Sequence, residues 1–130
     1  MDSLFYTFIV YNMKKIFHLS TCSTCQKILA AWNIPKDIVL QDIKLELYSA
    51  QELDEMKQLA GSYEAIFSKR ALKYKEWGVK EKIRTDEDYR TFLLKDYTFL
   101  KRPVLVVNNH LFAGNSQKNV DAAKTFLASL

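Results

Sequence analysis

The apolar and polar positions in the first third of the chain follow two different periods. A short apolar run at 15–19 predicts a buried strand, and apolar residues at helical spacing predict a helix over 24–33. Pro35 ends that helix, because the residue before a proline is held in extended conformations. A second apolar run, at 38–43, predicts another strand. The three elements form a βαβ unit, so we expect two parallel strands joined by a right-handed crossover.

The central part of the chain, about 49–96, carries helix signals. Ser49 and Glu52 form a capping box that predicts the start of a helix, and Gly61 predicts its end. A short helix is expected over 62–67. The buried face of the first of these helices is expected to consist of Leu53, Met56 and Leu59.

The second half of this central part is rich in charge. In the segment 68–84 the pattern is weak, and Tyr74 and Trp77 are the residues expected to anchor it to a core. Thr85 is the expected N-cap of a helix over 86–95, whose apolar residues have helical spacing.

The last third of the chain predicts a hairpin followed by a helix. The run 104–107 is the clearest strand signal, and Asn108 with Asn109 suits a tight turn because asparagine tolerates a positive φ. A partner strand is expected around 111–112, and a final helix after Ser116. The apolar positions of that helix are Val120, Ala123, Leu127 and Leu130.

Length and charge restrict the class of protein. The 130 residues suit a single domain, and 48% hydrophobic residues suit a globular core. No apolar run approaches the ~20 residues of a membrane-spanning helix, so no membrane association is expected. The net charge of +4 is spread among acidic residues, so it favours a small anionic partner as much as nucleic acid, and direct nucleic-acid binding is not expected.

The segment 1–13 differs from the rest of the chain. It is apolar but lacks a positively charged start and a small-residue cleavage site, so it does not resemble a secretory signal. We expect it to be an extension from an upstream start codon, with Met13 opening the functional domain at 14–130. The alternative is an additional edge strand, which its β-branched and aromatic residues would suit.

Cys22 and Cys25 are the only cysteines and form a single C-x-x-C motif between the first strand and the first helix. Free backbone N–H groups and the helix dipole favour an anion at such a junction, and a thiolate is the reactive form of cysteine. Two cysteines in this arrangement favour a redox role in a reducing cytoplasm. Two alternatives remain: inert buried thiols, or a zinc site that would also need His18 and His110.

The order of the elements supports the redox interpretation. A strand, a helix, a strand, a helical insertion, a hairpin and a last helix follow one another in thioredoxin-like folds. That fold places its redox motif at the first strand-to-helix turn. We therefore predict an α/β protein with a thioredoxin-like mixed sheet.

Three separate blocks of sequence resemble the glutaredoxin-like arsenate reductase family, which also includes the Spx-type transcriptional regulators. The blocks are 18–25 (HLSTCSTC), 67–74 (FSKRALKY) and 100–104 (LKRPV), and the resemblance extends over about 14–127. It implies a thioredoxin-like core interrupted by a helical insertion, with a cis peptide bond before Pro103, next to the cysteine.

The resemblance also implies roles for individual residues. Cys22 corresponds to the nucleophile and Cys25 to a resolving cysteine, while His18 corresponds to a histidine that favours the thiolate. Arg70 and Arg102 correspond to arginines that hold an oxyanion, which guanidinium groups bind through paired hydrogen bonds. The remaining residues expected against the substrate are Ser23, Thr24 and Pro103.

Each of these residues also has a simpler interpretation. His18 alone would be a half-buried strand residue, and His110 a residue of the hairpin turn. Arg70 lies among lysines and could be a solvated charge on a helix. Arg102 is the stronger candidate, because the strand after it should run beside the redox turn and direct the arginine toward Cys22.

Two departures from the arsenate reductase pattern leave the substrate open. Dedicated reductases usually have no cysteine at the position of Cys25, and they carry a third arginine near the segment 111–115, where this chain has none. Gly114 is instead typical of the regulators and of thiol-reductase members.

The predicted function is that of a cytoplasmic thiol–disulfide oxidoreductase acting on an oxyanion or a glutathione mixed disulfide. No tightly bound cofactor and no metal are expected. Glutathione, glutaredoxin or a thioredoxin-type protein would supply electrons. The alternative is an Spx-like redox sensor that binds the α subunit of RNA polymerase.

Overall fold

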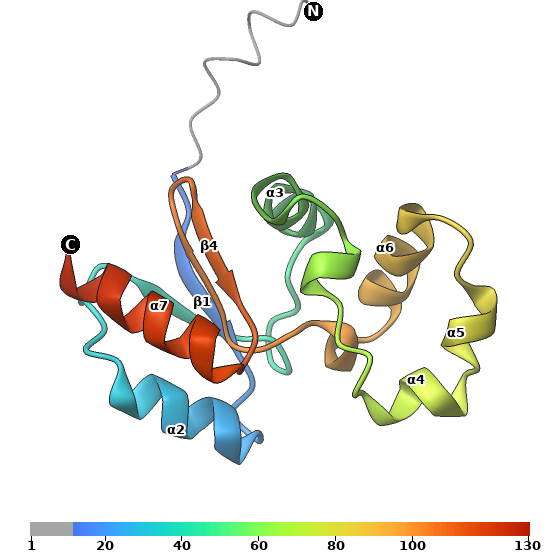
Figure 1. Ribbon diagram of the computed structural model, residues 1–130, viewed down its shortest axis with the longest axis horizontal. Coiled ribbons are helices and arrows are strands. Elements are labelled where there is room, and N and C mark those ends of the chain that lie inside the picture. Colours follow the sequence, from blue (N-terminus) through green and yellow to red (C-terminus); the bar gives the residue numbers. More distant parts are fainter. Residues whose placement is uncertain (1–11) are drawn as a thin grey trace, which may run out of the picture.

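The computed structural model describes residues 12–130 (Figure 1). The predictions for the N-terminal extension therefore lie outside the described residues, except at its end, where the carbonyl of Met13 accepts a hydrogen bond from the N–H of Asn108. The strands are β1 (Lys14–His18), β2 (Val39–Asp42), β3 (Val104–Val107) and β4 (His110–Ala113). The helices are α2 (Ser23–Ala31), α3 (Ala50–Ala60), η1 (Glu64–Ile66), α4 (Leu72–Glu76), α5 (Val79–Lys82), α6 (Asp86–Lys95), η2 (Tyr97–Phe99) and α7 (Gln117–Ala128).

The four strands form one mixed sheet in the order β2-β1-β3-β4. β1 runs parallel to β2, with Ile16 beside Leu40, and antiparallel to β3, with Ile16 beside Leu105. β3 and β4 form the predicted hairpin, whose two turn residues begin with Asn108 at φ 53°. The sequence prediction of a thioredoxin-like mixed sheet is confirmed.

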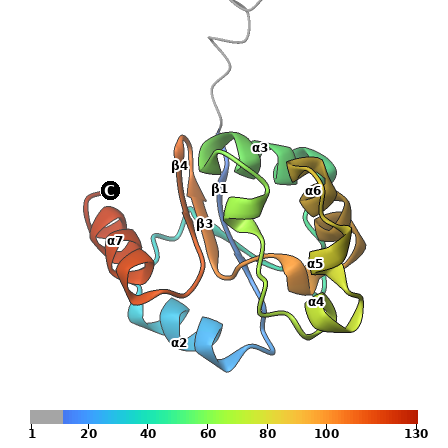
Figure 2. The same cartoon turned by 45° about the vertical axis from the view of Figure 1, so that its right-hand side comes forward.

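Alternation along the strands produces a core on each face of the sheet. Ile16 and Leu105 face α2 and α7, whereas the neighbouring Phe17 and Val104 face the helical insertion. Figure 2 shows α2 and α7 on one side of the sheet and α3 to α6 on the other. Burial on both faces explains why β3 consists entirely of apolar residues and why Ile16 and Phe17, at neighbouring positions of β1, are both buried.

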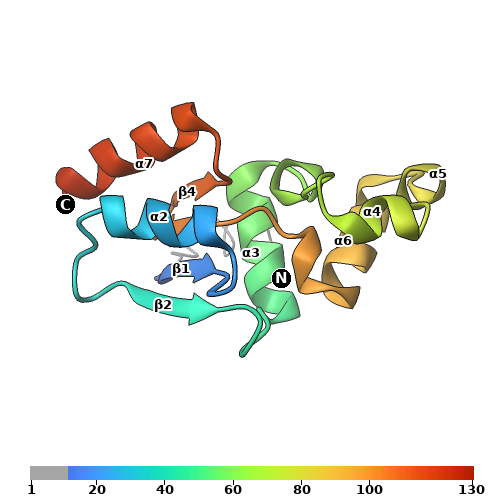
Figure 3. The ribbon, with the colours of Figure 1, turned by 90° about the horizontal axis from the view of Figure 1, so that it is seen from below.

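The helical insertion is held together by an aromatic cluster around Phe99. Its ring stacks on Phe67 at 5.1 Å and meets Trp77 at 5.6 Å and Phe92 at 5.9 Å between ring centroids. Tyr74 packs edge-on against Phe67 at 6.1 Å. Trp77 and Tyr74 are therefore the anchors that the sequence predicted. Figure 3 shows α4, α5 and α6 beyond α3, at a distance from the sheet.

Several predicted boundaries are corrected by the structure. The helix expected over 62–67 is the single turn η1, and the segment 68–84 contains two short helices separated by Gly78 at φ 59°. Leu130 lies beyond α7 and is 62% exposed, so it does not belong to the core. His110 is the first residue of β4 rather than a turn residue.

β2 is an edge strand, and its side chains reflect that position. Val39 and Leu40 are exposed, while Gln41 is buried, accepting a hydrogen bond from Lys15 Nζ at 2.9 Å and donating to the carbonyl of Glu46 at 3.0 Å. The strand predicted at 38–43 is therefore present as β2; Ile38 and Ile43 on either side of it are buried, whereas Val39 and Leu40 within it are exposed. In the described part of the chain, no helix has the length and hydropathy that crossing a bilayer requires.

Candidate functional site

A tight turn after β1 places Cys22 at the start of a helix. The N–H of Cys22 donates to the carbonyl of Leu19 at 3.0 Å, and the N–H of Gln26 donates to the carbonyl of Cys22 at 3.0 Å. Cys22 is the N-cap of α2 and has an extended backbone. Because the first N–H groups of a helix lack intrahelical partners, the sulfur lies where a negative charge is stabilised.

The two cysteines are both free thiols in different surroundings. Cys22 is partly exposed, whereas Cys25 is completely buried. Burial raises the pKa of Cys25 above its ordinary value, although a hydrogen bond with the backbone of Leu19 and the charge of Arg102 act in the opposite direction. Cys25 is therefore a protonated thiol at neutral pH, beneath a more accessible Cys22.

His18 is the last residue of β1, opposite Asp42 of β2. Its Nδ1 lies 3.2 Å from the side-chain amide nitrogen of Gln26, which also donates to the carbonyl of Leu19 at 2.9 Å. Gln26 therefore ties His18 to the turn that carries the cysteines. Among the hydrogen bonds of the described residues, His18 has none with Cys22.

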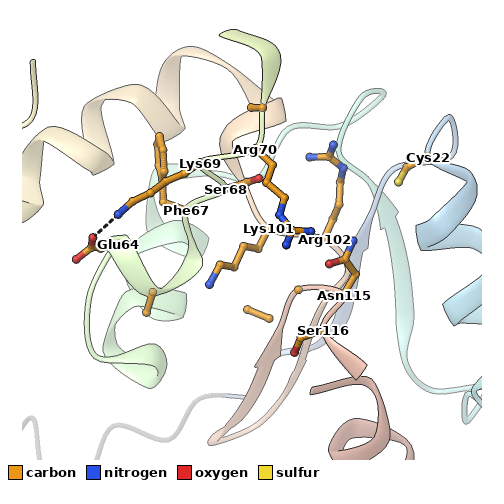
Figure 4. Close-up of a pocket in the computed structure, with 14 residues that line it drawn as sticks. Cys22, Glu64, Phe67, Ser68, Lys69, Arg70, Lys101, Arg102, Asn115 and Ser116 are labelled. Atoms are coloured by element: carbon orange, nitrogen blue, oxygen red, sulfur yellow. Dashed lines mark hydrogen bonds and ion pairs between the residues drawn. The ribbon is translucent and has the colours of Figure 1, made fainter. Parts of the chain in front are cut away.

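Cys22 opens onto a cleft of about 640 Å³. In Figure 4, Cys22 lies at one end of the cleft, and Glu64 with Lys69 lies at the other. Four segments of the chain line it: Cys22 itself, residues 64–65 and 67–71, residues 101–102, and residues 113–116. The site is therefore assembled from residues that are far apart in the sequence.

A single antiparallel bridge brings two of these segments together. Phe67 pairs with Leu100, the N–H of Ser68 donates to the carbonyl of Phe99 at 2.6 Å, and the N–H of Lys101 donates to the carbonyl of Ile66 at 2.9 Å. This bridge places the residues that follow each partner, including Arg70 and Arg102, on the same cleft.

Arg102 is held firmly by backbone carbonyls. Its Nη1 donates to the carbonyls of Thr98 at 3.1 Å and Leu100 at 3.2 Å, and the next peptide bond, to Pro103, is cis. Its Nε is buried and has no hydrogen-bond partner among the described residues. Buried donors are nearly always paired, so this nitrogen is suited to a bound acceptor. Arg70, in contrast, is exposed on the cleft wall.

The third wall of the cleft depends on Gly114. Its φ of 99° favours glycine, and its N–H donates to the carbonyl of Pro103 at 2.9 Å. The side chain of Lys101 passes across it, with Cδ 3.5 Å from where a β-carbon of residue 114 would lie. Ser116 then caps α7 by accepting a hydrogen bond from the N–H of Asn119 at 3.2 Å.

The charges of the cleft are mainly positive. Glu64 is the one carboxylate among its lining residues, and it forms an ion pair with Lys69 at 2.8 Å. Arg70, Lys101 and Arg102 have no carboxylate partner within the described residues. A cleft with three unpaired cations and one accessible thiol is suited to an anionic electrophile.

The structure brings together some, but not all, of the predicted site residues. Cys22, Arg70 and Arg102 share the cleft, with Cys25 buried beneath Cys22. The other predicted contacts do not line it: His18 is bound to Gln26, Ser23 and Thr24 are exposed in the first turn of α2, and Pro103 is buried.

Three residues of the cleft were not predicted from the sequence: Lys101, Asn115 and Ser116. A signal was present for Lys101, which immediately precedes Arg102 in one of the three characteristic blocks. No comparable signal marks Asn115 or Ser116. In residues 12–130, no three metal-binding side chains of His, Cys, Asp or Glu come together.

Comparison with known proteins identifies the family. The model of the ArsC family matches residues 17–123. This chain belongs to the ArsC family. The predicted resemblance is therefore confirmed, and no curated protein sequence matches the chain.

Solved structures agree with this assignment. An ArsC family related protein from Bacteroides fragilis is 25% identical, with a TM-score of 0.69 over 87% of this chain and 99% of that one. The arsenate reductase of Vibrio cholerae is 23% identical, with a TM-score of 0.66 over 85% and 98%. An arsenate reductase related protein from Brucella melitensis is 22% identical, with a TM-score of 0.62 over 85% and 92%. The last two show the shared fold.

The two arginines are expected to differ in what their loss changes. In a Cys22→Ser background, which prevents reaction, arsenate serves as a probe anion for the cleft, and Arg70→Met and Arg102→Met should each weaken its binding about tenfold, because each removes one cation from the cleft wall. Only Arg102→Met should also lower the free energy of unfolding, by about 1–3 kcal/mol, since it leaves the carbonyls of Thr98 and Leu100 unpaired.

Calorimetric titration and urea unfolding measure these two effects. Arg70 is exposed, so Arg70→Met should change the free energy of unfolding by no more than about 0.5 kcal/mol. A loss of stability in Arg70→Met with unchanged arsenate affinity would make that arginine structural.

Proposed function

We propose that this ArsC-family protein is a thiol oxidoreductase resembling the arsenate reductases, with Cys22 as nucleophile and Cys25 as resolving cysteine. The observation that carries the proposal is the position of Cys22. It caps α2, it is partly exposed, and it opens onto a cleft shared with Arg70 and Arg102. Anionic groups are stabilised in such surroundings, which favours both the thiolate and a negatively charged substrate.

In the first step, the Cys22 thiolate attacks the electrophilic atom. With a mixed disulfide, a new S–S bond to Cys22 forms, the substrate S–S bond breaks, and one thiol leaves after taking up a proton. With an oxyanion, the Cys22 sulfur binds the central atom and displaces water. In both cases Arg70 and Arg102 lie in the cleft where the negative charge of the substrate must be accommodated.

In the second step, Cys25 releases the product. The Cys25 thiol loses its proton and attacks the Cys22 sulfur, which forms the Cys22–Cys25 disulfide. The bond between Cys22 and the substrate breaks, and its electron pair leaves with the reduced product. The dithiol thus supplies two electrons. Glutathione or a thioredoxin-type protein is the class of reductant that would restore it.

A turnover assay tests the proposal. Purified protein should reduce arsenate or a glutathione mixed disulfide when coupled to glutathione or to a thioredoxin system, and Cys22→Ser should abolish turnover while keeping the circular dichroism spectrum. Full activity of Cys22→Ser would overturn the proposal. Absence of turnover, together with redox-dependent capture of the RNA polymerase α subunit, would instead favour a sensor.

A further inference from the structure

The cleft beside Cys22 is much larger than an oxyanion. Its volume is about 640 Å³. A tetrahedral oxyanion consists only of a central atom and its oxygens. The cleft instead has the size of sites that enclose organic ligands, about 300–1,000 Å³. A ligand that fills the cleft must therefore be an organic molecule, of which the atom attacked by Cys22 is only one part.

The end of the cleft away from Cys22 carries one uncompensated charge. Glu64 and Lys69 neutralise each other in their ion pair, and Glu64 also accepts a hydrogen bond from the hydroxyl of Tyr89 at 3.1 Å. Lys101 forms no ion pair within residues 12–130, although, after the hydrogen bond from Lys69, its charge helps to lower the pKa of Glu64. In Figure 4 its ammonium points away from Cys22, toward the end that holds Glu64 and Lys69.

The stem of Lys101 is held at its backbone and along its aliphatic carbons, whereas its ammonium forms no hydrogen bond or ion pair within residues 12–130. Its backbone N–H is bound to the carbonyl of Ile66 at 2.9 Å, and its aliphatic chain packs over Gly114. Because the stem is packed, fewer rotamers of Lys101 remain to be lost when its ammonium binds a ligand. Lys101 is therefore a positioned cation, suited to a carboxylate at some distance from the reacting sulfur.

We propose that Lys101 binds a carboxylate of the substrate, and that the substrate is a disulfide of an anionic thiol rather than a bare oxyanion. The inference rests on the proposed attack by Cys22. The reaction converts the disulfide into two thiols and the Cys22–Cys25 dithiol into a disulfide, so no further oxidant is needed. Lys101 takes no part in bond formation. It determines which disulfides bind, by favouring those that carry a carboxylate.

Three disulfides test the inference on the reduced protein. Oxidised glutathione carries carboxylates. Its ethyl esters keep the same peptide and disulfide but have no charged carboxylates, and bis(2-hydroxyethyl) disulfide is small and uncharged. The reaction is quenched with N-ethylmaleimide, and the Cys22–Cys25 disulfide is counted by intact mass. The wild type should react about tenfold faster with oxidised glutathione than with its esters, as expected for one charge-assisted contact.

Matched lysine variants locate the effect. Lys101→Met should bring the ratio of the rates with oxidised glutathione and with its esters to about one, and the rate with bis(2-hydroxyethyl) disulfide corrects each variant for any general change in reactivity. Lys124→Met removes an equal charge from the exposed face of α7, outside the cleft, and should keep the preference. Equal wild-type rates with the acid and the esters, or a preference retained by Lys101→Met, would overturn the inference alone. A wild type that reacts with none of the three disulfides would overturn the proposed function as well.

Discussion

The Cys25→Ser variant is expected to stop halfway through the reaction and to retain the substrate thiol on Cys22. After exposure to oxidised glutathione, intact mass should show one glutathione per chain, and peptide mapping should place it on Cys22. The physical reason is the arrangement of α2. Cys25 lies three residues after Cys22, the N-cap, and is completely buried. Residues three apart in a helix lie on the same face, so Cys25 is the thiol placed to resolve an adduct on Cys22.

Three samples make this result decisive. The wild type should pass through the adduct to the internal disulfide, and Cys22→Ser should form no adduct, because its remaining thiol is buried. Cys25→Ser should accumulate the adduct nearly completely. An equally persistent adduct on the wild type would show that Cys25 does not resolve it, and a structural role for Cys25 would follow.

The pKa of Cys25 also predicts how resolution depends on pH. Burial raises this pKa above the ordinary value, so only a small fraction of Cys25 is thiolate near neutral pH. Below that pKa, the thiolate fraction rises about tenfold per pH unit. The decay of the adduct on the wild type should accelerate accordingly from pH 6 to pH 8, whereas the adduct on Cys25→Ser should persist throughout.

Local structures, which depend on residues close together in the sequence, were predicted correctly. The capping box is formed as predicted, with Glu52 accepting from the N–H of Ser49 at 3.0 Å and Ser49 accepting from that of Glu52 at 3.0 Å. The hairpin turn at Asn108 and the strand that precedes it also follow from local preferences. Such signals act over a few residues, so one sequence contains them completely.

Features that depend on the position of an element in the fold were harder to predict from the sequence. The exposure of Val39 and Leu40 follows from the place of β2 at the edge of the sheet, which no local pattern specifies. Likewise, Lys101 belongs to the cleft only because Phe67 pairs with Leu100 across a long separation in sequence. The cysteine and arginine positions were predicted because the family resemblance already contained that long-range information.

Phe99 is the residue on which this long-range arrangement most depends. Its ring is completely buried among Phe67, Trp77 and Phe92, and its carbonyl accepts the N–H of Ser68 in the bridge that assembles the cleft. Phe99→Ala is therefore expected to lower the free energy of unfolding by about 3–5 kcal/mol, because it leaves a cavity at the centre of the cluster. That is a large share of the ~5–15 kcal/mol typical of a domain.

Urea unfolding followed by circular dichroism measures the loss, with Leu72→Ala as the control. Leu72 is 82% exposed at the start of α4, and its truncation should change the free energy of unfolding by no more than about 0.5 kcal/mol. Should Phe99→Ala fail to fold, Phe99→Leu keeps most of the apolar volume and should give a smaller loss. If Phe99→Ala and Leu72→Ala unfold at the same urea concentration, the aromatic cluster does not support the insertion, and the walls of the cleft must be held by the bridge alone.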